Sequence, residues 1–462
     1  MEWIRVSSSL KTITTLSQRA RSARLLSVIF VITTPQFFYM KKLNTYFSPL
    51  AALIAILSSL LFVWYQSNQV ERNELSGDVN DRTTVSITTL SDQLEKDPEN
   101  LKLAIALSDA YLQKIRETGD ATLYLKIEEV LDRVGSDKDV RGEVLAKRAE
   151  IANGRHDFVQ GLAYILEALA LNPQSASYYG IKTDSEIELG KYDDAERSLQ
   201  KMVDIKPNFS SFSRVAYQRQ LRGDREGALE ALAAAISAGS IFPENIAWAL
   251  TESGKLHMSS DVAMAKRDFT KAIDIYPTYA PAYEGLGRVA FIEGDKEASL
   301  ANYLRAFEIL PVATNAIALG NFYEVAGDEV KAKQYYALAE LAYLDSKGTN
   351  VDLEYALFLA DHSDVVKALT LAQAVYETRQ SIYTADAYAW ALYKNNQSAK
   401  AEQYSNEALF LGGHDTGILY HAAMITNANG NAEASTTHVK RALELDESAS
   451  LLYSQALTDK PI

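Results

Sequence analysis

The 462-residue sequence contains no cysteine, so the chain cannot form disulfides, hold a metal through thiolates or use a thiol nucleophile. None of its six histidines stands in a metal-binding spacing such as H-E-x-x-H, and the sequence has neither a P-loop nor a G-x-S-x-G elbow. His414, Asp415 and His421 lie close in sequence, but we interpret the histidines as a loop residue and a helix-packing residue rather than as metal ligands. We therefore expect a protein that is not an enzyme and that binds neither a cofactor nor a metal.

A basic stripe for nucleic acid is also missing. The net charge is −14, and the first 45 residues carry seven basic side chains and one acid, a balance of +6. The rest of the chain therefore carries −20. Because nucleic-acid phosphates require a positively charged surface, we expect no nucleic-acid partner.

What the sequence does contain is a small residue that recurs every 33 to 37 residues. This series consists of Ala168, Met202, Ala235, Ala272, Ala306, Ala339, Val375, Ala408 and Ala442. Seven residues before each member stands a second small residue: Gly161, Ala195, Ala228, Ala265, Ser299, Ala332, Ala368, Ala401 and Ser435. A period near 34 with this internal spacing indicates stacked helix–turn–helix hairpins. The alternative is a helical bundle with chance alanine spacing, but a bundle needs no constant period.

Glycine and proline mark the helix ends in most units. Glycine followed by a polar residue is expected to end the first helix in the left-handed conformation, at Gly190, Gly223, Gly294, Gly327 and Gly430. Proline stops the second helix because it cannot continue the hydrogen-bond ladder, at Pro173, Pro207, Pro277 and Pro311. The unit at 361–375 lacks its turn glycine.

The clearest unit contains Tyr283, Leu286, Gly287, the turn Gly294-Asp295-Lys296, Ala306 and Pro311. These residues resemble the tetratricopeptide repeat (TPR) family, whose pattern is W-x2-L-G-x2-Y in the first helix and A…F…A…P in the second. The resemblance covers residues 99–447 and implies an all-α, right-handed α-solenoid of about ten TPR-like hairpins. We expect a degenerate hairpin at 100–115 and 121–134 before the regular series, and an insertion near 241–243.

A membrane anchor is expected before the repeats, within residues 40–66. Phe47–Tyr65 is almost continuously apolar and long enough to cross a bilayer, with Trp64 at its end and Lys41 and Lys42 before it. The positive-inside rule then predicts a single-pass membrane protein with a cytoplasmic amino terminus and an extracytoplasmic, periplasmic repeat array. A cleaved signal peptide is the alternative, although no A-x-A-like site follows the apolar run.

The segments that flank this anchor differ in composition. Residues 1–39 form a basic, serine-rich leader, and we expect translation to start at Met40; an organelle-targeting sequence is the alternative. Residues 67–98 are polar and read as a linker with a short helix at 86–94. Residues 448–462 form a carboxy-terminal cap or tail.

The resemblance also implies where partners bind, because the first helices of TPR arrays line a concave groove. Helical spacing places aromatic and polar side chains on one stripe of these helices: Tyr217, Gln220, Glu284, Arg288, Phe291, Asn321, Glu324, Asp386, Trp390, Tyr393, Tyr420 and Met424. The alternative is that some of these aromatics are buried between repeats. Asn321 has no lysine in register for a carboxylate clamp, and Arg288 flanked by glutamates suits an extended peptide of some basic character.

Together these observations predict a non-enzymatic scaffold or adaptor of a bacterial envelope that binds protein or peptide partners through the groove. The alternative is an accessory subunit of an envelope enzyme or assembly pathway, such as cofactor insertion or polysaccharide export, which rests on analogy alone. The oligomeric state does not follow from the sequence.

Overall fold

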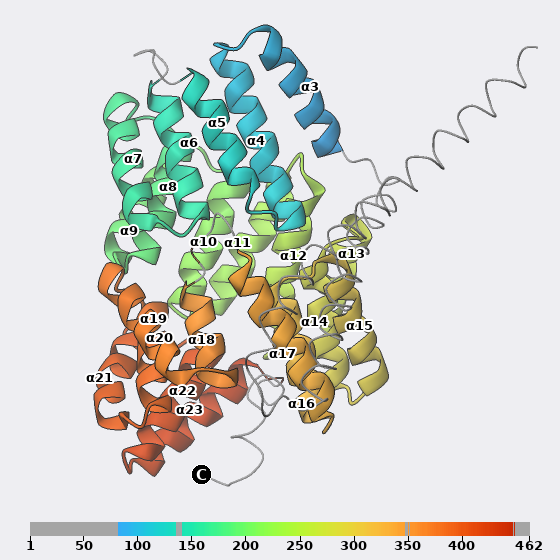
Figure 1. Ribbon diagram of the computed structural model, residues 1–462, viewed down its shortest axis with the longest axis vertical. Coiled ribbons are helices and arrows are strands. Elements are labelled where there is room, and N and C mark those ends of the chain that lie inside the picture. Colours follow the sequence, from blue (N-terminus) through green and yellow to red (C-terminus); the bar gives the residue numbers. More distant parts are fainter. Residues whose placement is uncertain (1–81, 135–140, 347–349, 351, 447, 449–462) are drawn as a thin grey trace, which may run out of the picture. The chain divides into compact units, whose positions relative to one another are not determined.

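The computed structural model describes residues 82–134, 141–346, 350, 352–446 and 448. These residues form helices and no strand (Figure 1). The helices are α3 Arg82–Lys96, α4 Leu101–Thr118, α5 Leu123–Val134, α6 Arg141–Gly154, α7 Phe158–Leu171, α8 Ala176–Glu188, α9 Tyr192–Ile205, α10 Phe209–Leu221, α11 Arg225–Ala238, α12 Pro243–His257, α13 Val262–Ile275, α14 Ala280–Ile292, α15 Lys296–Ile309, α16 Ala313–Val325, α17 Glu329–Leu344, α18 Asp352–His362, α19 Val365–Thr378, α20 Ile382–Lys394, α21 Ser398–Ala408, α22 Thr416–Ala428 and α23 Ala432–Leu445.

These helices pair into hairpins that stack in chain order. Ten hairpins run from α4/α5 to α22/α23 across the described residues, and each even-numbered first helix packs on the odd-numbered second helix that follows it. The second helices of most hairpins also pack on the next first helix, and neighbouring first helices touch, as α18 touches α20. The predicted all-helical repeat array is confirmed, including the degenerate pair, which is α4/α5.

Small residues are buried where two helices of a hairpin cross. The closing residues of the repeat series are buried, and most of its alanines have no exposed surface. Glycine has the same role in α12 and α14, where the ring of Phe269 lies against Gly254 and Gly285. A methyl group on Gly285 would lie 2.5 Å from the Phe269 ring. The recurring small residues therefore mark the places where two helices approach closely.

We expect Gly285→Ala to destabilise the array by about 1–3 kcal/mol, because the added methyl overpacks a filled core. Gly142→Ala is the matched control: its methyl would meet Leu171 at an ordinary 3.6 Å, and alanine favours a helix by about 1 kcal/mol over glycine. Denaturant unfolding monitored by circular dichroism measures both. Equal stability of the two variants would contradict this packing.

The expected turn conformation is confirmed. All five predicted turn glycines have positive φ, between 72° and 84°. In two other turns a residue other than glycine has positive φ: His156 at 62° and Asn396 at 60°. After Gly223, Gly294 and Gly327 an aspartate then caps the second helix, as Asp295 does by accepting a hydrogen bond from the Ala298 amide. The unit at 361–375, which has no turn glycine, still forms a hairpin, and Asp364 caps α19.

Part of the expected linker is helical. Helix α3 covers residues 82–96, packs on α4 and buries Leu94. The leader at 1–39, the apolar segment at 40–66 and most of the tail at 448–462 lie outside the described residues.

The predicted localisation is corrected. None of the helices in the described part of the chain is long and apolar enough to cross a membrane. The prediction of a single-pass protein with an extracytoplasmic array depended wholly on the segment at 47–65, which the structure does not describe.

The array also turns back on itself, so that hairpins about 190 residues apart in sequence touch. The Ile382 amide donates to the Tyr192 hydroxyl at 2.9 Å, and the Asn350 amide donates to the Arg155 carbonyl at 3.0 Å. In Figure 1 the orange helices α18–α20 accordingly follow directly below the green α8 and α9. We call these contacts the inter-turn contacts.

Candidate functional site

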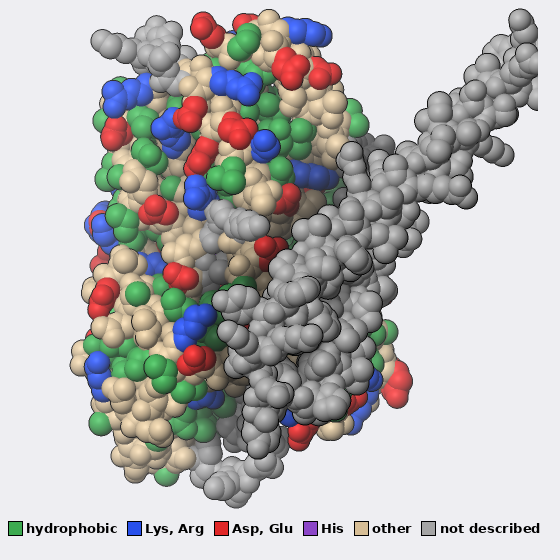
Figure 2. All heavy atoms as spheres, in the orientation of Figure 1, with side chains coloured by type: hydrophobic (Ala, Val, Ile, Leu, Met, Phe, Trp, Pro, Cys, Tyr) green, Lys and Arg blue, Asp and Glu red, His purple; other side chains and the backbone are tan. Residues whose placement is uncertain are grey.

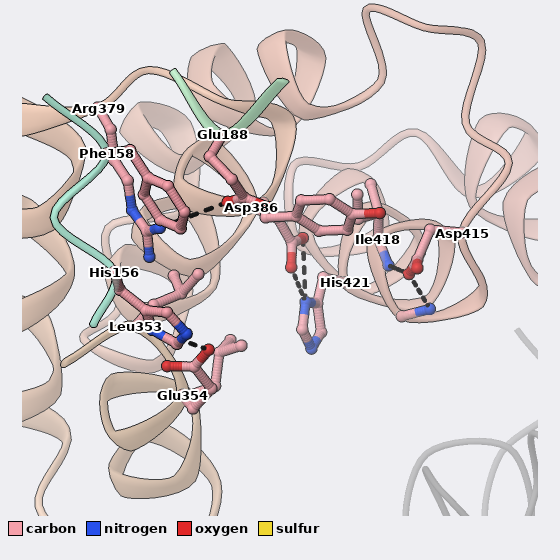
Figure 3. Close-up of a pocket in the computed structure, with 13 residues that line it drawn as sticks. His156, Phe158, Glu188, Leu353, Glu354, Arg379, Asp386, Asp415, Ile418 and His421 are labelled. Atoms are coloured by element: carbon pink, nitrogen blue, oxygen red, sulfur yellow. Dashed lines mark hydrogen bonds and ion pairs between the residues drawn. The ribbon is translucent and has the colours of Figure 1, made fainter. Parts of the chain in front are cut away.

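A cavity of about 350 Å³ lies within the inter-turn contacts (Figure 3). Its walls come from the start of α7, the end of α8, α18, the end of α19, α20 and the start of α22. The lining residues are His156, Phe158, Glu188, Leu353, Glu354, Leu357, Arg379, Tyr383, Asp386, Asp415, Gly417, Ile418 and His421. Side chains from distant repeats therefore meet in one site.

An ion pair joins the two turns at the upper side of this cavity in Figure 3. The Arg379 guanidinium lies 3.4 Å from Glu188 and 5.0 Å from the centre of the Phe158 ring. Burial raises the pKa of Glu188, although Arg379 opposes this shift. The pair thus bridges α8 and the end of α19 in a largely dehydrated place.

A second pair lies deeper, between α20 and α22. His421 Nδ1 lies 2.8 Å and 3.0 Å from the two Asp386 oxygens, and both side chains are buried. The Trp390 ring stacks on His421 with 4.1 Å between centroids. Burial lowers the pKa of His421, but the carboxylates of Asp386, Asp361 and Asp415 together raise it by more, so that the net shift is upward.

This upward shift gives a pH dependence with a definite sign. The stabilisation from protonated His421 is complete below its ordinary pKa of 6.5 and is lost as the pH rises through the raised folded value. We therefore expect His421→Gln to destabilise the array more at about pH 5.5 than at about pH 9. Denaturant unfolding at both pH values measures the difference. His438→Gln is the control, since burial and Arg441 lower the pKa of His438; an equal cost of His421→Gln at both pH values would contradict the pair.

The third carboxylate, Asp415, begins helix α22. It accepts hydrogen bonds from the amides of Gly417 at 2.8 Å and Ile418 at 3.1 Å. Burial nevertheless raises the pKa of Asp415. Glu354 supplies the fourth carboxylate: its Oε1 lies 4.0 Å from His156, and its Oε2 has no hydrogen-bond partner among the described residues.

The lining mixes acidic and apolar side chains, and Figure 3 shows Leu353 beside Glu354 and Ile418 beside Asp415. Four carboxyl groups and one permanent cation, Arg379, line the cavity, so acidic side chains outnumber Arg379 and the two histidines together by one. Apolar surface comes from Phe158, Leu353, Leu357 and Ile418. The lining contains no serine, threonine or cysteine, and no group of three His, Asp or Glu in the described part of the chain could hold a metal. Such a cavity accommodates a basic side chain with an aliphatic stem.

The structure distributes the predicted groove residues over several environments. Only Asp386 lines the cavity. Tyr217 and Gln220 line a smaller recess of about 30 Å³ beside it, where the Tyr217 and Tyr383 hydroxyls lie 3.5 Å apart. Trp390 and Tyr420 are buried between repeats, as the alternative held for some of the aromatics.

The remaining predicted residues mostly contact their own chain. Tyr393 and Met424 are half-buried against the core that contains Trp390. The Tyr336 hydroxyl lies 2.8 Å from both Asn321 Oδ1 and Glu324 Oε2. Phe291 packs on the Tyr303 cluster, and Arg288 lies 3.8 Å from Glu284.

Sequence reasoning missed most of the cavity. His156, Phe158, Glu188 and Arg379 stand at helix ends rather than on the first-helix stripe, so helical spacing gave no reason to group them. The available signal was the mixture of charges at the ends of α8 and α19, which only the superhelical geometry brings together.

Known proteins resemble this chain in parts. No family model matches it. The small glutamine-rich tetratricopeptide repeat-containing protein 2 of Saccharomyces cerevisiae is 23% identical over 182 residues, which is 37% of this chain. The match spans 53% of that relative, about half its length.

Solved structures resemble the chain at low scores. The type IV pilus biogenesis factor PilW has a TM-score of 0.38 at 15% identity, over 46% of this chain and 97% of its own. The human IFIT1 dimer with m7Gppp-AAAA has a TM-score of 0.42 at 14% identity, over 88% of this chain and 92% of its own. Scores in this range support no functional inference. The phased repeat and the stacked hairpins are those of a tetratricopeptide-like helical array, and the yeast relative that resembles part of this chain is named for the same repeat.

Proposed function

We propose that this protein is a non-enzymatic scaffold that binds protein partners, and that a lysine or arginine of the partner enters the inter-turn cavity. The observation that carries this proposal is the lining itself, in which four carboxylates and one permanent cation are interspersed with apolar side chains. A basic side chain would pack its stem on Leu353, Leu357 and Ile418 and place its charge among the carboxylates. Half-buried Tyr217, Gln220, Tyr393 and Met424 are proposed to contact the partner around this anchor.

Glu354 is the carboxylate best suited to a test. It belongs to α18, its Oε2 has no hydrogen-bond partner among the described residues, and its Oε1 lies 4.0 Å from His156 Nδ1. Replacing it therefore breaks few contacts of the fold. Glu433 in the first turn of α23 is an exposed glutamate on a second helix and provides a control of equal charge change.

The experiment pans a randomised peptide library against the full chain. We expect enrichment of peptides with lysine or arginine, loss of this enrichment in Glu354→Lys, and its retention in Glu433→Lys. Equal enrichment of neutral peptides in the wild type, or basic peptides that bind Glu354→Lys as well as the wild type, would exclude the cavity as the anchor.

The surface is consistent with a protein partner. Figure 2 shows acidic and basic side chains interspersed over the face in view. The expectation that nucleic acid is not a partner stays a prediction.

A further inference from the structure

Two described residues that follow the last helix contact a helix in the middle of the array. Arg288 on α14 forms an ion pair with Asp446, the residue after α23. Its Nε also donates to the Ser448 hydroxyl at 3.0 Å. These partners lie about 160 residues from Arg288 in sequence, so the contact is tertiary rather than local.

The two carboxy-terminal residues form a compact acceptor for one guanidinium. Asp446 Oδ1 accepts hydrogen bonds from the Ser448 amide at 2.9 Å and from its hydroxyl at 2.7 Å. The other oxygen, Oδ2, is then the one that pairs with Arg288. A planar guanidinium can donate to a carboxylate and a hydroxyl at the same time, whereas a lysine ammonium lacks this fixed geometry.

Arg288 requires a carboxylate at this position. Its side chain is 14% exposed, and its other acidic neighbour, Glu284, lies 3.8 Å away on the same helix. If only the Asp446 carboxylate were removed, the buried guanidinium would keep a single counter-charge, Glu284, which is costly. An acidic residue at this position therefore stabilises Arg288.

Asp446 and Ser448 lie outside the helix pairs that form the array. Asp446 follows the last hairpin, and its backbone amide only completes the final turn of α23 by donating to the Ala442 carbonyl. Releasing its side chain breaks no helix pair, since α22 and α23 pack through other residues, including buried Ala442.

We propose that Arg288 anchors a second partner site, specific for an acidic Asp-x-Ser segment, and that this chain's own Asp446 and Ser448 occupy it until a partner displaces them. The inference rests on the proposed function only in taking the partner to be a protein. The proposed site lies on α14, outside the inter-turn cavity, and its ligand is acidic rather than basic.

The test uses the full chain and a fluorescent peptide, ELDESASLL, which repeats residues 444–452. Asp446→Asn vacates the site and should bind the peptide about tenfold or more tightly than the wild type, whose own segment competes at a high effective concentration. Adding Arg288→Gln should weaken binding about tenfold again, the size expected for a charge-assisted pair. Adding Arg305→Gln, an exposed arginine on α15, is the matched control and should change nothing.

Three results would overturn the proposal: equal binding by wild type and Asp446→Asn, unchanged binding after Arg288→Gln, or equal binding of the peptide ELNESASLL. Ser448→Ala is a second vacating variant, and circular dichroism verifies that each variant is folded. The double variant Asp446→Asn/Glu354→Lys should bind this peptide as tightly as the single variant Asp446→Asn. A negative result in this test would therefore not affect the role proposed for the inter-turn cavity. A negative result for the cavity would likewise not affect the site at Arg288.

Discussion

Replacing Trp390 by alanine is expected to destabilise the array by about 3–5 kcal/mol. Trp390 is 3% exposed, stacks on His421 and donates its indole N–H to Asp361 at 2.8 Å. The substitution leaves a large cavity and deprives Asp361 of a donor. Denaturant unfolding of the purified chain measures the loss.

This expectation differs from the one that the helical stripe alone suggests. An exposed hot spot could be truncated without unfolding, so that Trp390→Ala would abolish partner capture in a stable protein. Trp390→Phe keeps an aromatic ring over His421 and should recover part of the stability. A Trp390→Ala variant as stable as the wild type would contradict the packing described here.

Gly190→Ala is expected to separate the two turns of the array. Gly190 has φ of +72°, and an added methyl would lie 2.1 Å from the Gln380 carbonyl oxygen of the opposite turn. Backbone strain costs about 1–2 kcal/mol, and the clash adds about 1–3 kcal/mol unless the turns move apart. Small-angle scattering should therefore show a larger radius of gyration, together with a lower midpoint of unfolding.

The variant Gly430→Ala shows the effect of backbone strain without the clash. Gly430 has a similar φ of +84°, but an added methyl there meets nothing within 4 Å. It should lose stability through strain alone and keep the wild-type radius of gyration. Identical scattering and stability for the two variants would show that the contact at Gly190 does not hold the turns together.

The sequence predicts the hairpins well because their determinants are local. A small residue such as Ala272 must be small wherever two helices cross closely, and a turn residue such as Gly294 must be glycine-like wherever φ is positive. Both requirements recur in every unit, so the period shows them directly. The degenerate hairpin α4/α5 was also predicted, although it lies before the regular series.

The inter-turn contacts could not be predicted in this way. Which hairpins meet depends on small rotations that accumulate over five or more repeats, and no single unit records them. Asp386 and Arg288 therefore looked like groove residues awaiting a partner, whereas the structure pairs them with His421 and Asp446. A polar stripe on a first helix serves a partner or a distant repeat equally well.

The closure of the array on itself is tested most directly by a distance between two spin labels. The chain has no cysteine, so Lys191→Cys and Gln380→Cys provide the only labelling sites, and both residues are exposed beside the Gly190–Gln380 contact. Double electron–electron resonance should report a single short distance, near the lower limit of the method. An array that does not turn back would separate the labels by five hairpins, several tens of Å at about 8–10 Å between packed helices, and that result would contradict the account.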